Sequence, residues 1–350
     1  MLTLGSLFDG IGGWQLAAVR AGIKPLWSSE IDKFCCAVTK KHFPDTIQLG
    51  DINGIDCPPH VDIITAGSPC QDISIAGKRS GIHGERSGLF FRAVELVHRI
   101  RPKFFVWENV PAVLSSNGRL DFKAVLESIA QEPLPLPKHW SNAGVVDGRH
   151  CQICWRILDA QFFGVPQRRR RIFLVADFAG RRAVKILFEP ASLPRNPAPC
   201  TNTQSATAAR IGDVANCAVD ENHGQDCRIK RLADIAPTVN AKYGTSGNNT
   251  PPVAYGIGRD AFNQGRNGKF KLSIERENTP PLTARGAAAC ATTSAVRRLT
   301  PLECERLMGL PEHWTQGISD TQRYRAIGNG MAQPCADAIL HNIALKGGIL

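Results

Sequence analysis

The first half of the chain alternates short apolar runs with segments whose apolar residues recur at helical spacing. Helical spacing marks residues 14–22, a segment that starts at Ile31, and residues 89–100. Strands separated by helices of this length are typical of a parallel sheet with helices on both faces, so we predict an α/β fold. The runs expected to form strands are 2–8, 25–29, 61–66, 103–107 and 170–176, with a further strand ending at 50–52.

The composition changes after about residue 184. Residues 190–298 are rich in Pro, Gly, Thr and Asn, and long helical patterns are missing there, which predicts a loop-rich second domain or, alternatively, a disordered linker. A pattern of Pro, any residue, an aliphatic, a polar residue, Ala and a basic residue occurs at 237–242 and again at 280–285. Helices are expected again from Thr300-Pro301-Leu302-Glu303, which reads as a capped start, and over 334–345.

The chain has 350 residues and a net charge of +11, with 42 Lys and Arg against 31 Asp and Glu. Such an excess favours a polyanionic partner, usually nucleic acid, although a merely basic enzyme is the alternative. The 12 cysteines are irregularly spaced and neither an export signal nor an apolar run of 18 residues is found, so we expect reduced thiols and a cytoplasmic protein.

The first strand leads into a glycine-rich turn, Phe8-Asp9-Gly10-Ile11-Gly12-Gly13, and then a helix. Such a turn lets the backbone approach a nucleotide-like ligand closely, and its incomplete G-x-G-x-x-G spacing weakens an oxidoreductase interpretation. Glu30, about 20 residues later, can accept hydrogen bonds from ribose hydroxyls, and Asp51 can face an adenine amino group. Together these positions predict an adenosine pocket without identifying the adenosine compound.

A cysteine and an acid follow two further predicted strands. Cys70 comes directly after a Gly-Ser-Pro turn, where a side chain is aimed from the edge of the sheet into a cleft, and a loop over 72–88 could close over a polyanion. Glu108 directly follows the strand at 103–107; the alternative is an ordinary role as a helix cap or a salt-bridge partner. A thiol and an acid at neighbouring strand ends suit attack on a ring whose nitrogen must gain a proton.

Four consecutive arginines open the strand at 170–176. Strand alternation predicts that Arg169 and Arg171 lie on one face and Arg168 and Arg170 on the other. Arginines that enter a core strand are costly unless anions meet them, so this segment is expected to contact an anionic ligand rather than to be a solvated surface run.

Taken in order, these motifs resemble the cytosine-5 DNA methyltransferases, in a compact form of the bacterial or phage type. The resemblance runs from residue 3 to about 340, with its main gap at 180–296; Leu310 stands where Phe is usual and Met331 follows the Gly-Asn-Gly. The matching motifs are Phe8 to Gly13, Pro69-Cys70-Gln71, Glu108-Asn109-Val110, Gln167-x-Arg169-x-Arg171, Arg298 to Pro311 and Gly328-Asn329-Gly330.

The resemblance implies a Rossmann-like, S-adenosylmethionine-dependent methyltransferase sheet with a smaller target recognition domain. It implies S-adenosylmethionine as methyl donor, S-adenosylhomocysteine as product, no metal, and double-stranded DNA as substrate, and we expect a monomer. The catalytic and cofactor-binding domain would comprise 1–180 and 320–350, the target recognition domain 181–298, and a hinge 299–319. The cofactor pocket would be formed by Phe8, Gly10, Gly12, Gly13, Glu30, Ile31, Asp51, Ile52, Leu89 and Asn329.

In the implied reaction, the Cys70 thiolate adds to carbon 6 of a cytosine flipped out of the duplex, which makes carbon 5 nucleophilic. Glu108 would hydrogen-bond or protonate ring nitrogen 3, and Arg169 and Arg171 would favour the thiolate and contact the cytosine carbonyl oxygen. The expected DNA-binding residues are Gln71, Arg79, Arg86, Gln167, Thr238 and Thr283, the last two in the repeated pattern.

Three alternatives stay open at the level of sequence. The same chemistry could act on cytosine in RNA, although a large basic insert before Leu299 favours DNA. The chain could be a catalytically silent DNA-binding regulator, against which the presence of Cys70 and Glu108 argues. A structural zinc site is suggested by Cys151 and Cys154, but no second pair lies at zinc-finger spacing.

Overall fold

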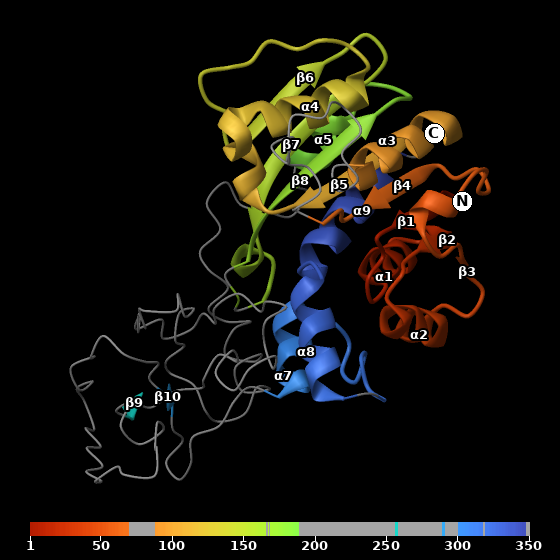
Figure 1. The fold of residues 1–350 in the computed structure, drawn as a ribbon, viewed down its shortest axis with the longest axis vertical. Coiled ribbons are helices and arrows are strands. Elements are labelled where there is room, and N and C mark those ends of the chain that lie inside the picture. Colours follow the sequence, from red (N-terminus) through yellow and green to blue (C-terminus); the bar gives the residue numbers. More distant parts are fainter. Residues whose placement is uncertain are drawn as a thin grey trace. The chain divides into compact units, whose positions relative to one another are not determined.

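The computed structural model describes residues 1–69, 88–165, 167, 169–188, 256–257, 289–290, 300–317 and 319–347. The chain divides into two compact units (Figure 1). The first comprises Met1–Leu158, Arg170–Arg195 and Cys335–Leu350, and the second comprises Asp159–Arg169 and Asn196–Pro334. The predicted target recognition domain lies almost wholly outside the described residues, so the predicted functional boundaries stay a prediction.

An eight-stranded sheet in the order β3-β2-β1-β4-β5-β8-β7-β6 forms the centre of the first unit. The pairs β3–β2, β2–β1, β1–β4 and β4–β5 are parallel, whereas β5–β8 and β7–β6 are antiparallel. The strands are β1 Thr3–Leu7, β2 Lys24–Ser29, β3 Ile47–Gln48, β4 Ile63–Ala66, β5 Phe104–Asn109, β6 Ala143–Asp147, β7 Gln152–Asp159 and β8 Arg170–Asp177. The prediction of an α/β fold is confirmed, but the sheet is mixed rather than wholly parallel.

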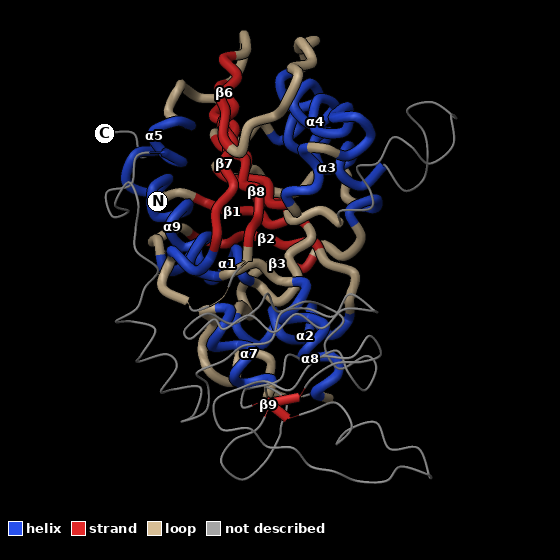
Figure 2. The backbone as a smooth tube through the Cα atoms, turned by 90° about the vertical axis from the view of Figure 1, so that its left-hand side faces the viewer, coloured by secondary structure: helices blue, strands red, loops and turns tan. Residues whose placement is uncertain are grey.

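Helices cover both faces of this sheet. Figure 2 views the sheet from its edge, with α1, α5 and α9 on one side and α3 and α4 on the other. The α-helices of this unit are α1 Gly13–Arg20, α2 Lys33–His42, α3 Gly88–Ile100, α4 Leu120–Ala130, α5 Ala183–Phe188 and, from Cys335 onward, α9 Gln333–Gly347. Short 3-10 turns lie at Ile52–Gly54, Pro111–Leu114 and Ser116–Arg119, and a further one, Ala160–Phe162, belongs to the second unit. Among the described residues, none of the helices has the length and apolar character needed to cross a membrane.

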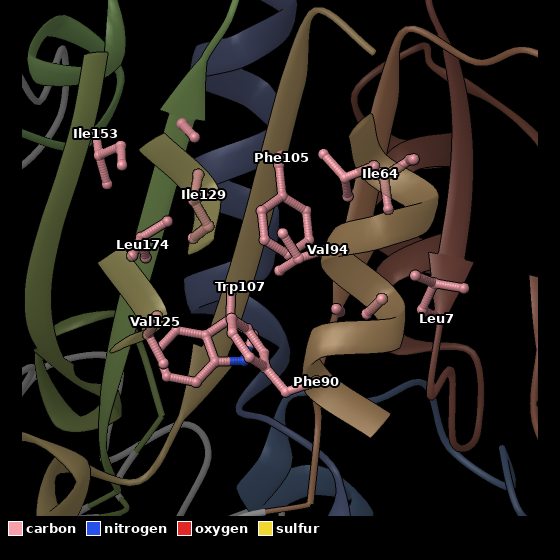
Figure 3. Packing of buried hydrophobic residues seen from close by; sticks show 14 of the residues in the cluster. Leu7, Ile64, Phe90, Val94, Phe105, Trp107, Val125, Ile129, Ile153 and Leu174 are labelled. Atoms are coloured by element: carbon pink, nitrogen blue, oxygen red, sulfur yellow. The ribbon is translucent and has the colours of Figure 1, made fainter. Parts of the chain in front are cut away.

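The sequence explains where these elements begin and how they pack. The Asp32 carboxylate accepts the backbone N–H groups of Phe34 and Cys35 and so caps α2. On the face covered by α3 and α4, the strands bury a continuous apolar cluster in which Trp107 packs against Phe90, with ring centroids 5.3 Å apart (Figure 3). Burial of aromatic side chains makes a large contribution to the stability of such a core.

The second unit contains α7 Pro301–Met308, α8 Asp320–Asn329 and a two-stranded sheet of β9 Gly256–Ile257 and β10 Ala289–Cys290. The predicted helix start at Thr300 is confirmed: its side chain accepts the Glu303 backbone N–H, and the Glu303 carboxylate accepts the Thr300 backbone N–H. The closing helix predicted over 334–345 is α9.

Two strands were not predicted, and one ends early. β6 is an edge strand with no clear apolar alternation, and β7 follows it as its hairpin partner. Cys151 and Cys154, the pair that suggested zinc, are buried in the core beside and within β7, and burial raises the pKa of Cys151 to about 11 and of Cys154 to about 12. The strand expected to end at 50–52 ends at Gln48, and a 3-10 turn follows.

Candidate active site

The predicted site residues lie at or near one edge of the sheet, where the parallel strands β1 to β5 end and the antiparallel strand β8 begins. The carboxyl ends of parallel strands meet at the same edge, and β1 lies at the switch point where the strand order reverses. Because β8 runs antiparallel to β5, its first residues start at that same edge. This topology explains how Arg171, more than 60 residues after Glu108, reaches the acid.

Glu108 and Arg171 form an ion pair at this edge. The Arg171 Nε lies 3.1 Å from the Glu108 Oε1, and both side chains are mostly buried. A methyl group placed on Gly67 would lie 3.8 Å from the Glu108 Oε2, so the acid lies beside the chain that leaves β4 toward Cys70. The acid is therefore held next to the backbone that leads to the predicted nucleophile.

The end of β4 is fastened to β5 by two side chains. The Trp107 indole Nε1 donates to the Ser68 Oγ at 3.0 Å, and the Asn109 Nδ2 donates to the Ser68 backbone oxygen at 3.1 Å. The Asn109 Oδ1 accepts the Val110 backbone N–H at 2.8 Å, so both ends of this amide are engaged. Sequence reasoning used Asn109 only as part of a motif and did not identify Ser68.

Arg169 and Arg171 have different bonding partners. Arg169 is 1% exposed, and its Nη2 donates to the backbone oxygens of Gly328, at 2.8 Å, and Gly330. β8 begins at Arg170, so Arg169 lies just before the strand, and the predicted shared face for Arg169 and Arg171 stays a prediction. The catalytic role of Arg169 stays a prediction; the observed contacts hold the Gly-Asn-Gly turn at the end of α8.

Gln167 is also buried in the second unit. Its Nε2 donates to the Leu307 backbone oxygen at 2.9 Å and contacts the Met308 Sδ at 3.5 Å. These contacts tie the segment before β8 to the last turn of α7. Its predicted role in DNA binding is untested.

The glycine-rich turn and Glu30 form one hydrogen-bonded unit. The Gly10 N–H donates to the Glu30 Oε2 at 2.8 Å, and the Ile31 and Asp32 N–H groups both donate to Oε1 at 2.8 Å. Gly10 has φ +57° and open space where a Cβ would stand, whereas a Cβ on Gly12, at φ +82°, would lie 2.8 Å from the Phe43 ring. Glycine at these positions meets a backbone requirement and leaves the turn open for a ligand.

The other predicted cofactor residues follow strand ends or begin helices. Ile31 follows Glu30 with 74% of its surface exposed, which is unusual for a large apolar side chain and leaves an apolar platform beside the acid. The exposed Asp51 carboxylate accepts the Asn53 backbone N–H at 2.9 Å, and Ile52 is buried. Of the remaining residues, Phe8 has φ +53°, Gly13 begins α1, Leu89 lies in the first turn of α3, and Asn329 is the last residue of α8.

A buried acid that sequence reasoning did not single out lies inside the glycine-rich turn. Asp9 is 5% exposed, and its Oδ2 accepts the Gln15 Nε2 at 2.6 Å. Burial raises the pKa of Asp9 to about 7. Its position between Phe8 and Gly10, directly after an apolar strand, was the available signal in the sequence.

Several predicted site residues lie outside the described residues, and their roles stay predictions. They are Cys70, Gln71, Arg79, Arg86, Thr238 and Thr283.

The chain is similar to known methyltransferases in both fold and sequence. The S. pombe Dnmt2 methyltransferase structure shares the fold with a TM-score of 0.60 and 16% identity over 99% of this chain and 98% of that chain. The Type II methyltransferase M1.ScrFI of Lactococcus lactis subsp. cremoris is 30% identical over 348 residues, which cover 95% of this chain and 75% of that protein. A protein of Escherichia phage P1 named DNA N-6-adenine-methyltransferase is 27% identical over 456 residues; the match covers 95% of this chain, which spans 60% of that protein's length.

The fold is that of the Rossmann-like methyltransferases. Residues 2–345 match the C-5 cytosine-specific DNA methylase family, and the chain belongs to that family. The resemblance inferred from six ordered motifs is thereby confirmed.

Proposed function

We propose that this protein transfers a methyl group from S-adenosylmethionine to carbon 5 of a cytosine flipped out of duplex DNA at a specific sequence. S-adenosylhomocysteine is the second product. The proposal rests above all on the ion pair between Glu108 and Arg171, because it holds an acid beside the backbone that leads to Cys70.

The residues around the glycine-rich turn fit an adenosyl ligand. Gly10 is open on its Cβ side, the Glu30 carboxylate is fixed by three backbone N–H groups, and Ile31 offers an exposed apolar surface next to it. Glu30 would accept the ribose hydroxyls, Ile31 and Ile52 would contact the adenine, and Asp51 would accept its amino group. When bound, S-adenosylmethionine supplies a methyl group activated by a positively charged sulfur.

The residues of the chain perform the remaining chemistry on the cytosine ring. The Cys70 thiolate forms a bond to carbon 6, and the electrons of the carbon 5–carbon 6 double bond move into the ring. Glu108, when protonated at Oε2, would stabilise the charge that develops on the ring by donating a hydrogen bond or this proton to nitrogen 3. Carbon 5 can then accept the methyl group; a base removes its proton, the double bond re-forms and the thiolate is expelled.

Arg171 contributes by fixing the acid. Its guanidinium holds the Glu108 Oε1, which leaves the other carboxylate oxygen, Oε2, on the side of Gly67. A free cysteine thiol has a pKa of about 8.5, so only a small fraction is ionised near neutrality. The Arg171 guanidinium, if it lies beside the Cys70 thiol, would favour the thiolate.

Binding to DNA would draw on the net charge of +11 and fall steeply as salt rises, because phosphate contacts release counterions. We assign the reading of sequence to residues 181–298, with Thr238 and Thr283 as candidates. Phosphate contacts are assigned to the loop over 72–88, which contains Arg79 and Arg86, and Gln71 and Gln167 are further candidates for DNA binding. One base is modified at a time, so a monomer suffices.

Covalent capture tests this proposal. Bisulfite sequencing of DNA from a host that expresses the chain would first give the methylated sequence. A duplex of that sequence with 5-fluorocytosine at the target should then form a denaturant-resistant complex in the presence of S-adenosylmethionine. Fluorine replaces the carbon-5 proton and a base cannot remove it, so the thiolate is not expelled. Cys70→Ser should form no complex yet retain S-adenosylmethionine binding by calorimetry.

The methylated nucleoside that the protein produces distinguishes this reaction from methylation of adenine or of RNA. Nucleoside analysis should find 5-methylcytosine in DNA. N6-methyladenine instead, or methylated tRNA with unmodified DNA, would refute the proposed reaction or its substrate.

A further inference from the structure

The hydroxyl of Ser68 is the hydrogen-bond acceptor for a fully buried indole. Ser68 is 5% exposed, Trp107 is 0% exposed, and the Trp107 Nε1 lies 3.0 Å from the Ser68 Oγ. The indole ring belongs to the apolar cluster under α3 (Figure 3). A buried N–H that loses its acceptor is destabilised, so this pair resists displacement of either partner.

The same residue is held by its backbone. The Asn109 Nδ2 donates to the Ser68 backbone oxygen at 3.1 Å and lies 3.5 Å from the Oγ. On the other side of β4, the Gly67 N–H donates to the Leu7 backbone oxygen at 3.4 Å. The backbone at Gly67 and Ser68, just before Cys70, is therefore hydrogen-bonded to both neighbouring strands.

These two neighbours carry the rest of the proposed chemistry. β1 leads into the glycine-rich turn, and β5 carries Glu108 between Trp107 and Asn109. The two residues that hold Ser68, Trp107 and Asn109, stand directly before and after Glu108 in the sequence. Because side chains alternate along a strand, they point to the face opposite Glu108. Any shift of Ser68 relative to β5 changes where the chain toward Cys70 starts relative to the acid.

We propose that Ser68 is a positioning residue: its hydroxyl, held by Trp107, sets the register between the chain that carries the nucleophile and the strand that carries the acid. This inference rests on the proposed function. Ser68 acts through Cys70 and Glu108 and touches neither the cytosine nor the methyl donor.

The same strand provides a matched control. Thr65 is 0% exposed, and its Oγ1 has no hydrogen-bond partner in the described part of the chain. Thr65→Val and Ser68→Ala therefore each remove one buried hydroxyl from the β4 segment, but only Ser68→Ala removes the acceptor of the Trp107 indole.

The experiment measures single-turnover capture of the 5-fluorocytosine duplex by the full chain, with S-adenosylmethionine and DNA dissociation constants and melting temperature measured in parallel. Ser68→Ala should slow adduct formation roughly ten- to a hundredfold, because small misplacement of reacting groups costs rates of that order. Both dissociation constants should stay within about twofold, and Thr65→Val should react at the rate of the unmodified protein.

Trp107→Phe, which removes the donor, extends the test. It should slow capture as Ser68→Ala does, and the double variant should be no slower than the slower single variant, because both changes break one interaction. Equal rates for Ser68→Ala and Thr65→Val would overturn the positioning role, as would effects of Ser68→Ala and Trp107→Phe that multiply. Failure of the unmodified protein to form any adduct would instead overturn the proposed function beneath it.

Discussion

The Arg171 Nε lies 3.1 Å from the Glu108 Oε1, and the antiparallel pairing of β8 with β5 produces this contact. In a parallel arrangement the start of β8 would lie at the opposite edge of the sheet, away from the end of β5. The two side chains retain 18% and 14% of their exposure, so solvent screens their attraction only partly. The orientation of the acid is therefore built into the strand topology.

Glu108→Gln should preserve the shape of the site and remove its proton. We expect the single-turnover rate of methyl transfer to fall by about 10² to 10⁴, the range typical of a lost general acid. The dissociation constant for DNA, measured by fluorescence anisotropy, should change only a few-fold. Glu95→Gln, on the exposed side of α3, is the control and should react normally. A normal rate for Glu108→Gln would remove this residue from the acid role.

Arg171→Lys tests whether the ion pair acts as a unit. A lysine keeps the charge but loses the planar guanidinium, so we expect roughly a tenfold slower methyl transfer. The double variant Arg171→Lys/Glu108→Gln should be little slower than Glu108→Gln alone, since the partner of Arg171 is then already neutral. Rate losses that multiply in the double variant would show that Arg171 acts independently of Glu108.

Arg169→Lys separates the two arginines of the motif. One ammonium group replaces a planar fork that donates to the backbone oxygens of Gly328 and Gly330, so the turn that carries Asn329 should loosen. We expect the KM for S-adenosylmethionine to rise roughly fivefold or more, with a smaller change in adduct formation at saturating donor. Arg170→Lys, at an exposed position, is the matched control. An unchanged KM together with slow adduct formation would favour the catalytic role predicted for Arg169 from the sequence.

The sequence predicted the elements whose patterns depend on nearby residues. The capping box at Thr300 and Glu303 and the strand–turn–helix around Gly10 are local, and the structure contains both. Strand direction depends instead on contacts between distant segments, so the antiparallel placement of β8 could not be inferred from its composition.

The same limit applies to the site. The motif spacing placed Glu108 and Arg171 in one set of residues, and the structure pairs them. The contacts of Arg169 with Gly328 and Gly330 join residues 159 and 161 positions apart and could not be inferred from local spacing. The role of Ser68 depends on the indole of Trp107 across a strand pair, a contact between residues 39 positions apart that has no signature in the sequence.

Asp9 makes the stability of the protein depend on pH in an unusual direction. Burial raises its pKa from 3.8 to about 7, so between these values the folded state holds a proton that the unfolded state has lost. The free energy of unfolding should therefore fall as pH rises through this window, by an amount on the order of 4 kcal/mol. Asp9→Asn keeps an oxygen for the Gln15 amide and cannot ionise, so its free energy of unfolding should lose this component of the pH dependence. Chemical denaturation of both proteins at several pH values between 5 and 8, with the exposed variant Asp45→Asn as control, measures the difference. Parallel stability curves for Asp9→Asn and the unmodified protein would show that Asp9 is ionised throughout this range.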